Sequence, residues 1–495
     1  MAKYSVESAS YKGILKATSL FGGLQVFTVL IQVIKSKIIA VLLGAEGVGI
    51  EGLFKSGIEL VQSFTGLGLS NSAVRDVAEA NGTKDMAKIS RIVYVIRRLV
   101  WVTGILGLLS FAALSSWLSE FSFGNNDYTI SFLALSSVLL LDQICAGQKV
   151  VLQGLAKYSK LAKTTAYGTT IGLLVSIPFY YLLGVEGIVH TLILHSVCSL
   201  FCSWYFSRSI ILVKQSQSAR ETFIQSKTMV KMGLAMCLSS VEATLIAYLL
   251  RSFIRLEGGT VAVGFFQAGF VLMNSYVGLI FNAMGTDFYP RLANVNKDNN
   301  RCCQVINEQG IVASCLLTPI LVLFVIYFPI IISILYTKDF QCIGSYIMWA
   351  SLGMVFRLSS WLISFMFLAK GVSKLFILNE TLAKIYFFLF NIIGYKYGGL
   401  EGLGIAFAVS YVIYTIQVYI IANKKFEFSW DSDFVKLFAV TVSFVVVALI
   451  ICHLSTIYRF TFGGLVLLVS LIFSYIILDN KIGLSTIVKN KFKKR

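Results

Sequence analysis

The chain has 495 residues, of which 57% are hydrophobic and only 13% are charged. Soluble domains usually carry about 25% charged residues, so this composition excludes a soluble globular protein. The net charge of +18 would suit a nucleic-acid-binding protein, but the basic residues lie between hydrophobic runs instead of on one soluble face, which argues against nucleic acid as a partner.

Apolar runs of about 20 residues, the length that crosses the hydrocarbon core of a bilayer, recur along the whole chain. They predict an all-α membrane protein with about 14 transmembrane helices. In chain order, the predicted helices cover residues 18–43, 47–74, 92–118, 128–152, 161–183, 187–213, 230–251, 260–285, 308–335, 342–369, 374–395, 399–423, 434–454 and 460–478.

The loops between these helices differ in basic content. Most of the 42 Lys and Arg residues fall on the side that holds the N-terminus, whereas the opposite loops hold only Arg251, Arg255, Lys338, Lys396 and Arg459. Basic loops stay in the cytoplasm. We therefore expect a multi-pass membrane protein with both termini in the cytoplasm.

The sequence resembles itself at an offset of about 215 residues. Residues 184–188 (Gly-Val-Glu-Gly-Ile) match residues 399–403 (Gly-Leu-Glu-Gly-Leu), and Gly49 matches Gly264. An offset of six helices predicts two lobes related by a parallel pseudo-two-fold repeat, which rock against each other to give alternating access. The expected domains are an N-lobe (1–214, helices 1–6), a C-lobe (222–424, helices 7–12), and two additional helices with a basic cytoplasmic tail (425–495).

The first two predicted helices carry a distinctive run of small and apolar residues. It comprises residues 37–44 (Lys-Ile-Ile-Ala-Val-Leu-Leu-Gly), 47–50 (Gly-Val-Gly-Ile), 66–70 (Gly-Leu-Gly-Leu-Ser) and 72–75 (Ser-Ala-Val-Arg). This run resembles the O-antigen and polysaccharide repeat-unit flippases of the multidrug/oligosaccharidyl-lipid/polysaccharide exporter superfamily. The resemblance implies a protein of the bacterial inner membrane that is a transporter without a cofactor and not an enzyme. It would move an undecaprenyl-diphosphate-linked oligosaccharide from the cytoplasmic to the outer leaflet.

Charged residues inside the predicted spans are candidate site residues, because ionisable groups at bilayer depth usually face a cavity or a partner. The second helix carries Glu51, Lys55 and Glu59 at a spacing of four, and Lys35 lies at a similar depth in the first helix. Two interpretations stay open. The four charges form a self-neutralising patch that joins two helices, or Lys35 and Lys55 bind substrate in a cavity wall near the outer mouth.

Four further charges lie near mid-depth. Asp142 and Arg357 are separated by the repeat offset, and Glu242 and Lys384 lie at a similar level in the C-lobe. A diphosphate at this depth needs a compensating cation, which makes the Arg357 fork and the Lys384 ammonium candidate binding groups. Asp142 and Glu242 would hold these cations ready or couple transport to H⁺ or Na⁺. The alternative is permanent ion pairing, such as Glu242 with Lys384. No metal ligand cluster or catalytic residue is expected.

Other functions compete with the flippase. Within the same superfamily the alternatives are a multidrug or cation antiporter and a lipid II flippase, and from another class a membrane polysaccharide polymerase or acyltransferase. The mid-depth cations Arg357 and Lys384 disfavour cationic drugs, and the short outer loops disfavour a polymerase. Besides the lipid-linked oligosaccharide, membrane lipids are expected partners, and a polysaccharide polymerase is a candidate one.

Overall fold

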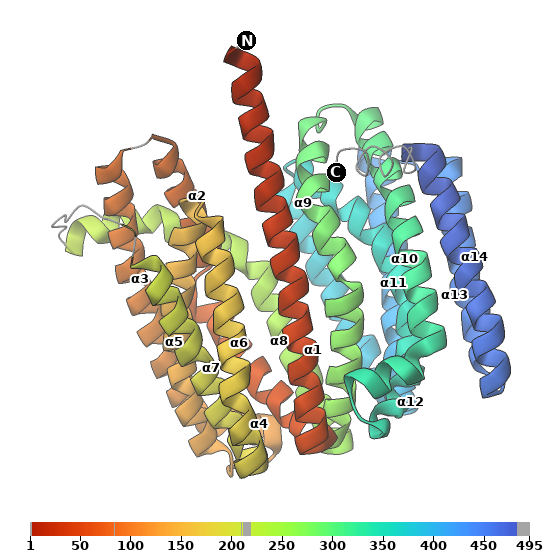
Figure 1. The fold of residues 1–495 in the computed structure, drawn as a ribbon, viewed down its shortest axis with the longest axis horizontal. Coiled ribbons are helices and arrows are strands. Elements are labelled where there is room, and N and C mark those ends of the chain that lie inside the picture. The colour runs from red at the N-terminus through yellow and green to blue at the C-terminus, as the bar shows by residue number, and fades with distance from the viewer. Residues whose placement is uncertain (1, 84, 209, 211–218, 483–495) are drawn as a thin grey trace. The chain divides into compact units, whose positions relative to one another are not determined.

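The computed structural model describes the backbone of residues 2–83, 85–208, 210 and 219–482, and most side chains from residue 23 onward. Every regular element within these residues is helical (Figure 1). A helix satisfies all its backbone hydrogen bonds within the segment, which a lipid environment requires. The predicted all-α membrane fold is therefore confirmed.

Backbone contacts divide the chain into two compact units, Met1–Gly264 and Phe265–Arg495. In the first unit, α6 packs against α1 and α7, and α5 packs against α3 and α7. Its elements are α1 (Ala2–Thr65), α2 (Leu69–Thr83), α3 (Met86–Ala113), α4 (Ser115–Phe123), α5 (Thr129–Gly154), α6 (Tyr158–Leu183), η1 (Gly184–Glu186), α7 (Gly187–Ser207) and most of α8 (Ala219–Val271).

The second unit begins near the end of α8. Its α11 packs against α12, and α10 contacts α11, α13 and α14. The elements are the π-helical turn η2 (Leu272–Val277), α9 (Leu279–Asn294), α10 (Asn299–Leu335), η3 (Lys338–Ile343), α11 (Gly344–Ala369), α12 (Ser373–Phe426), α13 (Ser432–Cys452) and α14 (Thr456–Ile482). The predicted lobes rest on the repeat and stay a prediction.

Four glycines mark the sharp turns between successive helical segments. Gly44, Gly259 and Gly399 interrupt α1, α8 and α12 with φ of 66°, 76° and 54°, and Gly184 ends α6 with φ of 57°. Positive φ is accessible to glycine without steric cost. Ten described stretches are long and apolar enough to span a membrane, and four of them contain one of these glycines. When these four stretches are divided at their glycines, the ten described stretches become fourteen segments. That each segment crosses the membrane stays a prediction.

The positive-φ positions recur at the repeat offset. Gly44 pairs with Gly259 and Gly184 pairs with Gly399, in each case at the offset seen in the sequence. The turn after α5 has its positive φ at Ala156, and the turn after α11 has it at Gly371, again one repeat later. Both turns are closed by equivalent backbone hydrogen bonds, from Lys157 N to Leu152 O at 2.8 Å and from Val372 N to Phe367 O at 3.0 Å. These matched turns support the predicted repeat.

Several predicted helix boundaries were wrong. The first helix begins at Ala2 instead of residue 18, and the second is broken by the turn at Gly66–Gly68, where Leu67 and Gly68 have positive φ. The predicted helix 92–118 is two helices, α3 and α4, and α7 ends at Ser207 instead of residue 213. Most of the basic C-terminal tail (483–495) lies outside the described residues.

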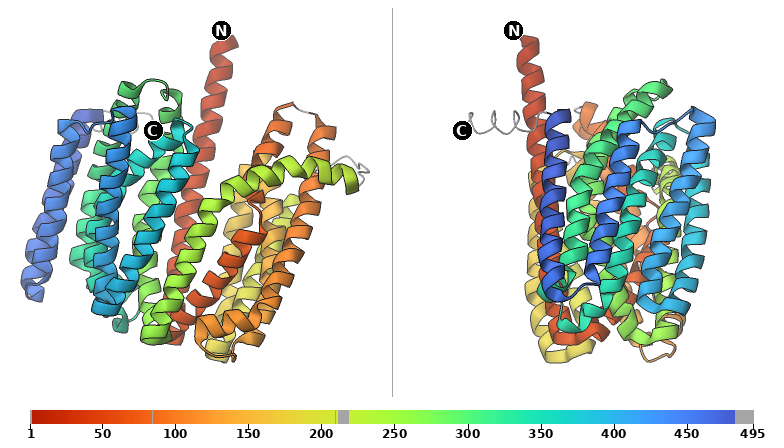
Figure 2. Two further views of the ribbon diagram at one scale, coloured as in Figure 1. Left: turned by 180° about the vertical axis from the view of Figure 1, so that it is seen from behind. Right: turned by 90° about the vertical axis from the view of Figure 1, so that its right-hand side faces the viewer.

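Two close helix crossings organise the first unit. A Cβ added to Gly49 would lie 2.0 Å from the carbonyl oxygen of Thr260, and one added to Gly264 would lie 1.8 Å from that of Ala45. At the opposite end, Gly68 and Gly233 approach equally closely. There the first part of α8 crosses α2 and α3 (Figure 2), and Met229 packs into a core that includes Leu69, Ala73, Val77 and Val100.

Candidate functional site

The first charged group is a bridge of three side chains within α1. The turn at Gly44 folds the helix back on itself, so that Lys35 before the turn meets Glu51 after it. The carboxylate of Glu51 accepts from the Lys35 and Lys55 ammonium groups, both at 2.9 Å. Glu51 and Lys35 are 10% and 15% exposed, and Lys55 is 39% exposed. One anion between two cations leaves one unit of positive charge in the trio.

Glu59 does not join this bridge. Its side chain is exposed, and it makes no ion pair with the residues that the structure describes. Lys55 follows Glu51 by one turn, whereas Glu59 follows by eight residues and is rotated roughly 80° around the helix. The interpretation as a self-neutralising patch of four charges is therefore wrong at Glu59. Sequence analysis missed two neighbours of this bridge. Tyr180 of α6 lies within electrostatic range of Glu51 and Lys55, and His195 of α7 lies within electrostatic range of Glu51 and both lysines.

Asp142 occupies a polar position inside the first unit. It lies half-buried on α5, close to the Ser196 hydroxyl group of α7. Lys149, two turns further along α5, is within electrostatic range. Asp142 thus lies between two helices of the same unit, near a hydroxyl group and a lysine. Glu242 is half-buried on α8 of this unit.

Arg357 occupies a polar and aromatic niche in the second unit. Its Nη1 donates to Oδ1 of Asn274 at 2.5 Å, and its guanidinium lies 5.5 Å from the ring centroids of both Phe281 and Tyr411. These partners come from η2, α9 and α12. Among the described residues, no carboxylate forms an ion pair with Arg357. The niche fixes the guanidinium with a neutral amide and two ring faces, and leaves its charge uncancelled.

A half-buried acid beside this niche was missed by sequence analysis. Glu380 of α12 accepts a hydrogen bond from the Tyr414 hydroxyl group, which lies 2.9 Å from the Ser364 hydroxyl group. Tyr411, whose ring lies near Arg357, is within electrostatic range of Glu380. Lys384 follows on the same helix and is half-buried. Because Glu242 and Lys384 belong to different units, their predicted pairing stays a prediction.

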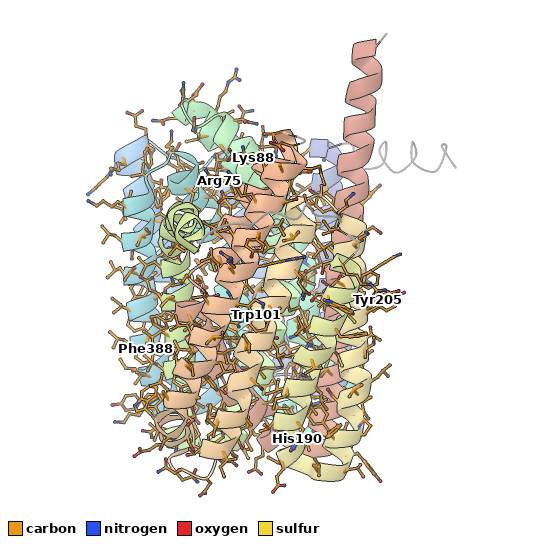
Figure 3. The ribbon with its side chains drawn as sticks, turned by 90° about the vertical axis from the view of Figure 1, so that its left-hand side faces the viewer. Arg75, Lys88, Trp101, His190, Tyr205 and Phe388 are labelled. Carbon is orange, nitrogen blue, oxygen red and sulfur yellow. The ribbon has the colours of Figure 1, made fainter. Side chains whose placement is uncertain are left out.

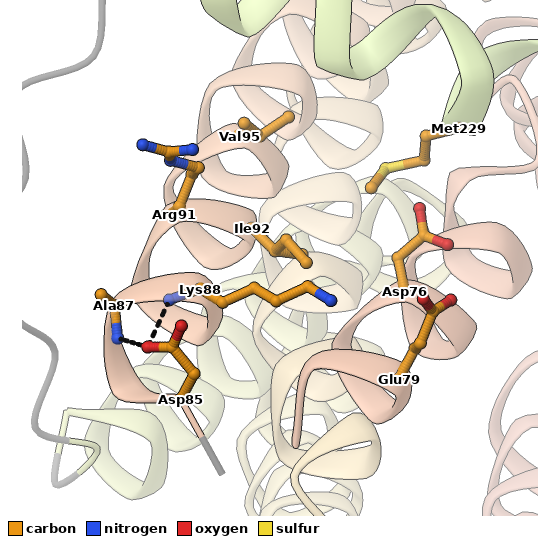
Figure 4. Close-up of a pocket in the computed structure, with 9 residues that line it drawn as sticks. All are labelled: Asp76, Glu79, Asp85, Ala87, Lys88, Arg91, Ile92, Val95 and Met229. Carbon is orange, nitrogen blue, oxygen red and sulfur yellow. Dashed lines mark hydrogen bonds between the residues drawn. The ribbon is translucent and has the colours of Figure 1, made fainter. Parts of the chain in front are cut away.

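A mixed-charge pocket of about 590 Å³ lies at the end of the first unit where α2 and α3 meet. Asp76 and Glu79 line one wall, Lys88 and Arg91 line the other, and Figure 4 shows the Lys88 ammonium pointing toward the two acids. Burial raises the pKa of Asp76 above its ordinary value. Asp85, also in the lining, caps α3 by accepting from Ala87 N at 2.8 Å. Three acids and two bases line this pocket and leave it without net positive charge, so we assign no anionic cargo to it.

Solved structures with similar folds are transporters. One is described as "Lipid II flippase MurJ, inward closed conformation"; it has a TM-score of 0.69 and 13% identity, covering 94% of this chain and 99% of that chain. Another is an inward-facing multidrug resistance MATE family transporter of the MOP superfamily, with a TM-score of 0.67 and 14% identity over 81% of this chain and 94% of the other.

A third similar structure comes from Pyrococcus furiosus. It is a MOP superfamily transporter described as having a binding pocket of reverse polarity, with a TM-score of 0.55 and 16% identity over 83% of this chain and 96% of that one. At these identities the likeness shows the fold alone. The predicted superfamily fold is confirmed.

Sequence comparison identifies the family. A search of curated proteins finds no significant match. The family model described as "Polysaccharide biosynthesis protein" matches residues 38–343, more than half of the chain, and this match covers all but the first residue of the small-residue run. The chain is a multi-pass membrane protein that belongs to the polysaccharide biosynthesis protein family.

Proposed function

We propose that this protein is a flippase that carries an undecaprenyl-diphosphate-linked oligosaccharide, such as an O-antigen repeat unit, from the cytoplasmic to the outer leaflet of the bacterial inner membrane by alternating access. The family is one of polysaccharide biosynthesis, and the fold is that of MOP superfamily transporters. Sugars on a lipid diphosphate are assembled at a membrane surface, and a transporter is needed to bring them across.

The observation that carries this proposal is the uncancelled charge of Arg357. A diphosphate brings at least two negative charges into a low-dielectric region, where an unpaired ion is costly. A guanidinium can meet phosphate oxygens with two parallel hydrogen bonds. Asn274 occupies one of its nitrogens, and the rings of Phe281 and Tyr411 lie at its sides. The niche therefore orients the Arg357 guanidinium group and leaves some of its N–H donors for the phosphate oxygens of the cargo.

The Lys35–Glu51–Lys55 trio provides a second positive group. Glu51 neutralises only one of its two lysines, and Lys55 is the more exposed of the two. In the proposed cycle the diphosphate passes from Arg357 and Lys384 to this trio, and Asp142, Glu242 or Glu380 take up the coupling H⁺ or Na⁺. A cationic drug would be repelled by both positive groups, which disfavours the antiporter alternative.

Substitution of Arg357 tests the proposal in cells. Arg357→Ala should abolish surface polymer while the protein still accumulates in the membrane, because the group removed meets cargo and no described acid depends on it. Arg357→Lys should keep part of the export, since a point charge still attracts phosphate without the fork. The measurement is surface polysaccharide normalised to membrane-inserted protein.

Arg301→Ala is the matched control. Arg301 lies in the same unit, is 73% exposed and pairs only loosely with Asp298 at 3.8 Å, so its removal should leave export unchanged. Normal export by Arg357→Ala would overturn the assigned role of Arg357. A fall in folded protein that accounts for all the lost export would make its role structural.

A further inference from the structure

A groove on the first unit is separate from the charged groups described above. It has a volume of about 980 Å³ and lies between α3, α5 and α7. Most of its lining is apolar or aromatic, and three large side chains in it are strongly exposed: Trp101 (52%), Phe201 (62%) and Trp204 (48%). In a membrane-spanning unit such side chains face lipid, so the groove opens to the bilayer.

One end of the groove is cationic. Arg97 of α3 and Arg208 at the end of α7 both line it and are both exposed. Arg208 lies over the ring of Tyr205 at 4.4 Å and over that of Trp204 at 5.4 Å. Within the described chain neither arginine forms an ion pair with an acid. Two guanidinium groups without an acidic partner among the described residues therefore lie at one end of the apolar groove.

The dimensions match one leaflet of a bilayer. From Val197 to Arg208 the groove follows α7 for eleven residues, a rise of about 17 Å, and half of a hydrocarbon core is about 15 Å. Figure 3 shows Trp101 and Tyr205 at a similar level on this lateral face, between Lys88 toward one end and His190 toward the other.

The groove also has a polar floor. Ser203 of α7 donates to the side-chain oxygen of Gln148 of α5, and Gln148 belongs to the lining. This amide lies below the arginine end, where the glycerol and ester groups of a phospholipid would lie if the headgroup met the arginines. Beyond its hydrogen bond with Ser203, this amide would find no further hydrogen-bond partner in a purely hydrocarbon occupant.

We propose that this groove binds one anionic phospholipid of the bilayer, with its phosphate at Arg97 and Arg208 and an acyl chain along Phe201 and Val197. With the predicted orientation, the lipid belongs to the cytoplasmic leaflet. Charge complementarity selects an anionic lipid over a zwitterionic one. The inference does not depend on the identity of the transported cargo, because no group assigned to cargo lines the groove.

Native mass spectrometry of the full-length protein in detergent tests this inference. We expect dioleoylphosphatidylglycerol to form one high-affinity adduct, and dioleoylphosphatidylcholine to bind at least about tenfold more weakly. The double variant Arg97→Ala/Arg208→Ala should weaken the phosphatidylglycerol adduct by at least about tenfold. The control Arg91→Ala/Lys163→Ala removes the same charge from exposed positions of the same unit and should bind like the wild type.

A second variant leaves the charge unchanged. Val197→Trp fills the apolar part of the groove at a side chain that is 43% exposed, and it should also displace the lipid. Equal phosphatidylglycerol binding by the arginine double variant and its control would overturn the proposal, as would equal binding of the two phospholipids. Preferential displacement of the adduct by undecaprenyl diphosphate would show that the groove takes the cargo lipid instead.

Discussion

The carboxylate of Glu51 holds two ammonium groups, so its removal leaves two cations in a membrane-spanning hairpin without an anion. Breaking a buried ion pair on one side costs about 3–5 kcal/mol, and because Lys55 reaches solvent we expect the lower end of this range for Glu51→Gln. The measurement is the thermal unfolding of purified protein. Glu59→Gln is the control: this exposed acid should change stability by no more than about 0.5 kcal/mol. Equal effects of the two substitutions on stability would show that the Lys35–Glu51–Lys55 bridge does not stabilise the protein.

Asn274 offers a way to cancel the charge of Arg357 without removing the guanidinium. Asn274→Asp places a carboxylate where the amide oxygen now lies 2.5 Å from Nη1, and the resulting ion pair should keep the protein folded. Binding of undecaprenyl diphosphate should fall by at least about tenfold, because the fork then faces a permanent anion. Thermal-shift titration with undecaprenyl diphosphate measures this. Unchanged affinity would indicate that the charge of Arg357 does not attract cargo.

Sequence patterns located the charged residues but only part of their surroundings. A spacing of four placed Glu51 and Lys55 together, and the apolar runs on either side of Gly44 placed Lys35 at a similar depth. The partners of Arg357 could not be predicted, because Asn274 and Tyr411 come from helices distant in sequence, one before it and one after it, and meet it only through tertiary packing. Glu380 was overlooked although it lies in a predicted span, and an acid in an apolar run was the available indication.

At the scale of elements, the crossing of α1 and α8 at Gly49 and Gly264 leaves no room for a side chain. Gly49→Ala or Gly264→Ala would place a methyl group about 2 Å from a backbone oxygen of the other helix, so the helices must separate. We expect each to destabilise the protein by about 1–3 kcal/mol, the usual cost of overpacking. Gly57→Ala is the control in the same helix, since its Cβ would meet Phe132 at an ordinary 3.4 Å. Equal melting temperatures for Gly49→Ala, Gly264→Ala and Gly57→Ala would contradict the close approach of α1 and α8.

The turns after α5 and α11 allow a paired test of the repeat. Ala156 has φ of 54° and Gly371 has φ of 72° in equivalent turns, and an L-residue in this region costs roughly 1–2 kcal/mol. Ala156→Gly should therefore raise stability by up to about 1 kcal/mol, and Gly371→Ala should lower it by about 1–2 kcal/mol. Thermal unfolding measures both. Changes of the same sign would show that the two turns are not equivalent.

Helix existence was easier to predict than helix ends. The length of an apolar run identifies a membrane span because the thickness of the bilayer sets that length. Each predicted span contains helical residues in the structure. The ends differ because polar residues also continue helices beyond the bilayer: α2 reaches Thr83 and α8 begins at Ala219. The turn at Gly66–Gly68 was hidden by its apolar composition, although two glycines around Leu67 are a sequence indication of such a turn.

At the scale of the whole molecule, each unit has a positive group whose charge is not fully neutralised. These groups distinguish the protein from a carrier of organic cations. The first unit has the Lys35–Glu51–Lys55 trio, and the second has Arg357 in its neutral niche. A cargo that carries a diphosphate should be attracted to both groups, whereas the same prenyl glycan without phosphates should not.

The most direct test is translocation by purified protein in proteoliposomes. An undecaprenyl-diphosphate-linked oligosaccharide should move between leaflets with the wild type, and a matched prenyl glycoside without phosphates should not. Arg357→Ala and Asn274→Asp should each lose the activity, and Arg301→Ala should retain it. We predict that only the wild type and the Arg301→Ala control move the diphosphate-linked cargo. Equal movement of both cargoes, or full activity in Arg357→Ala and Asn274→Asp, would contradict the account.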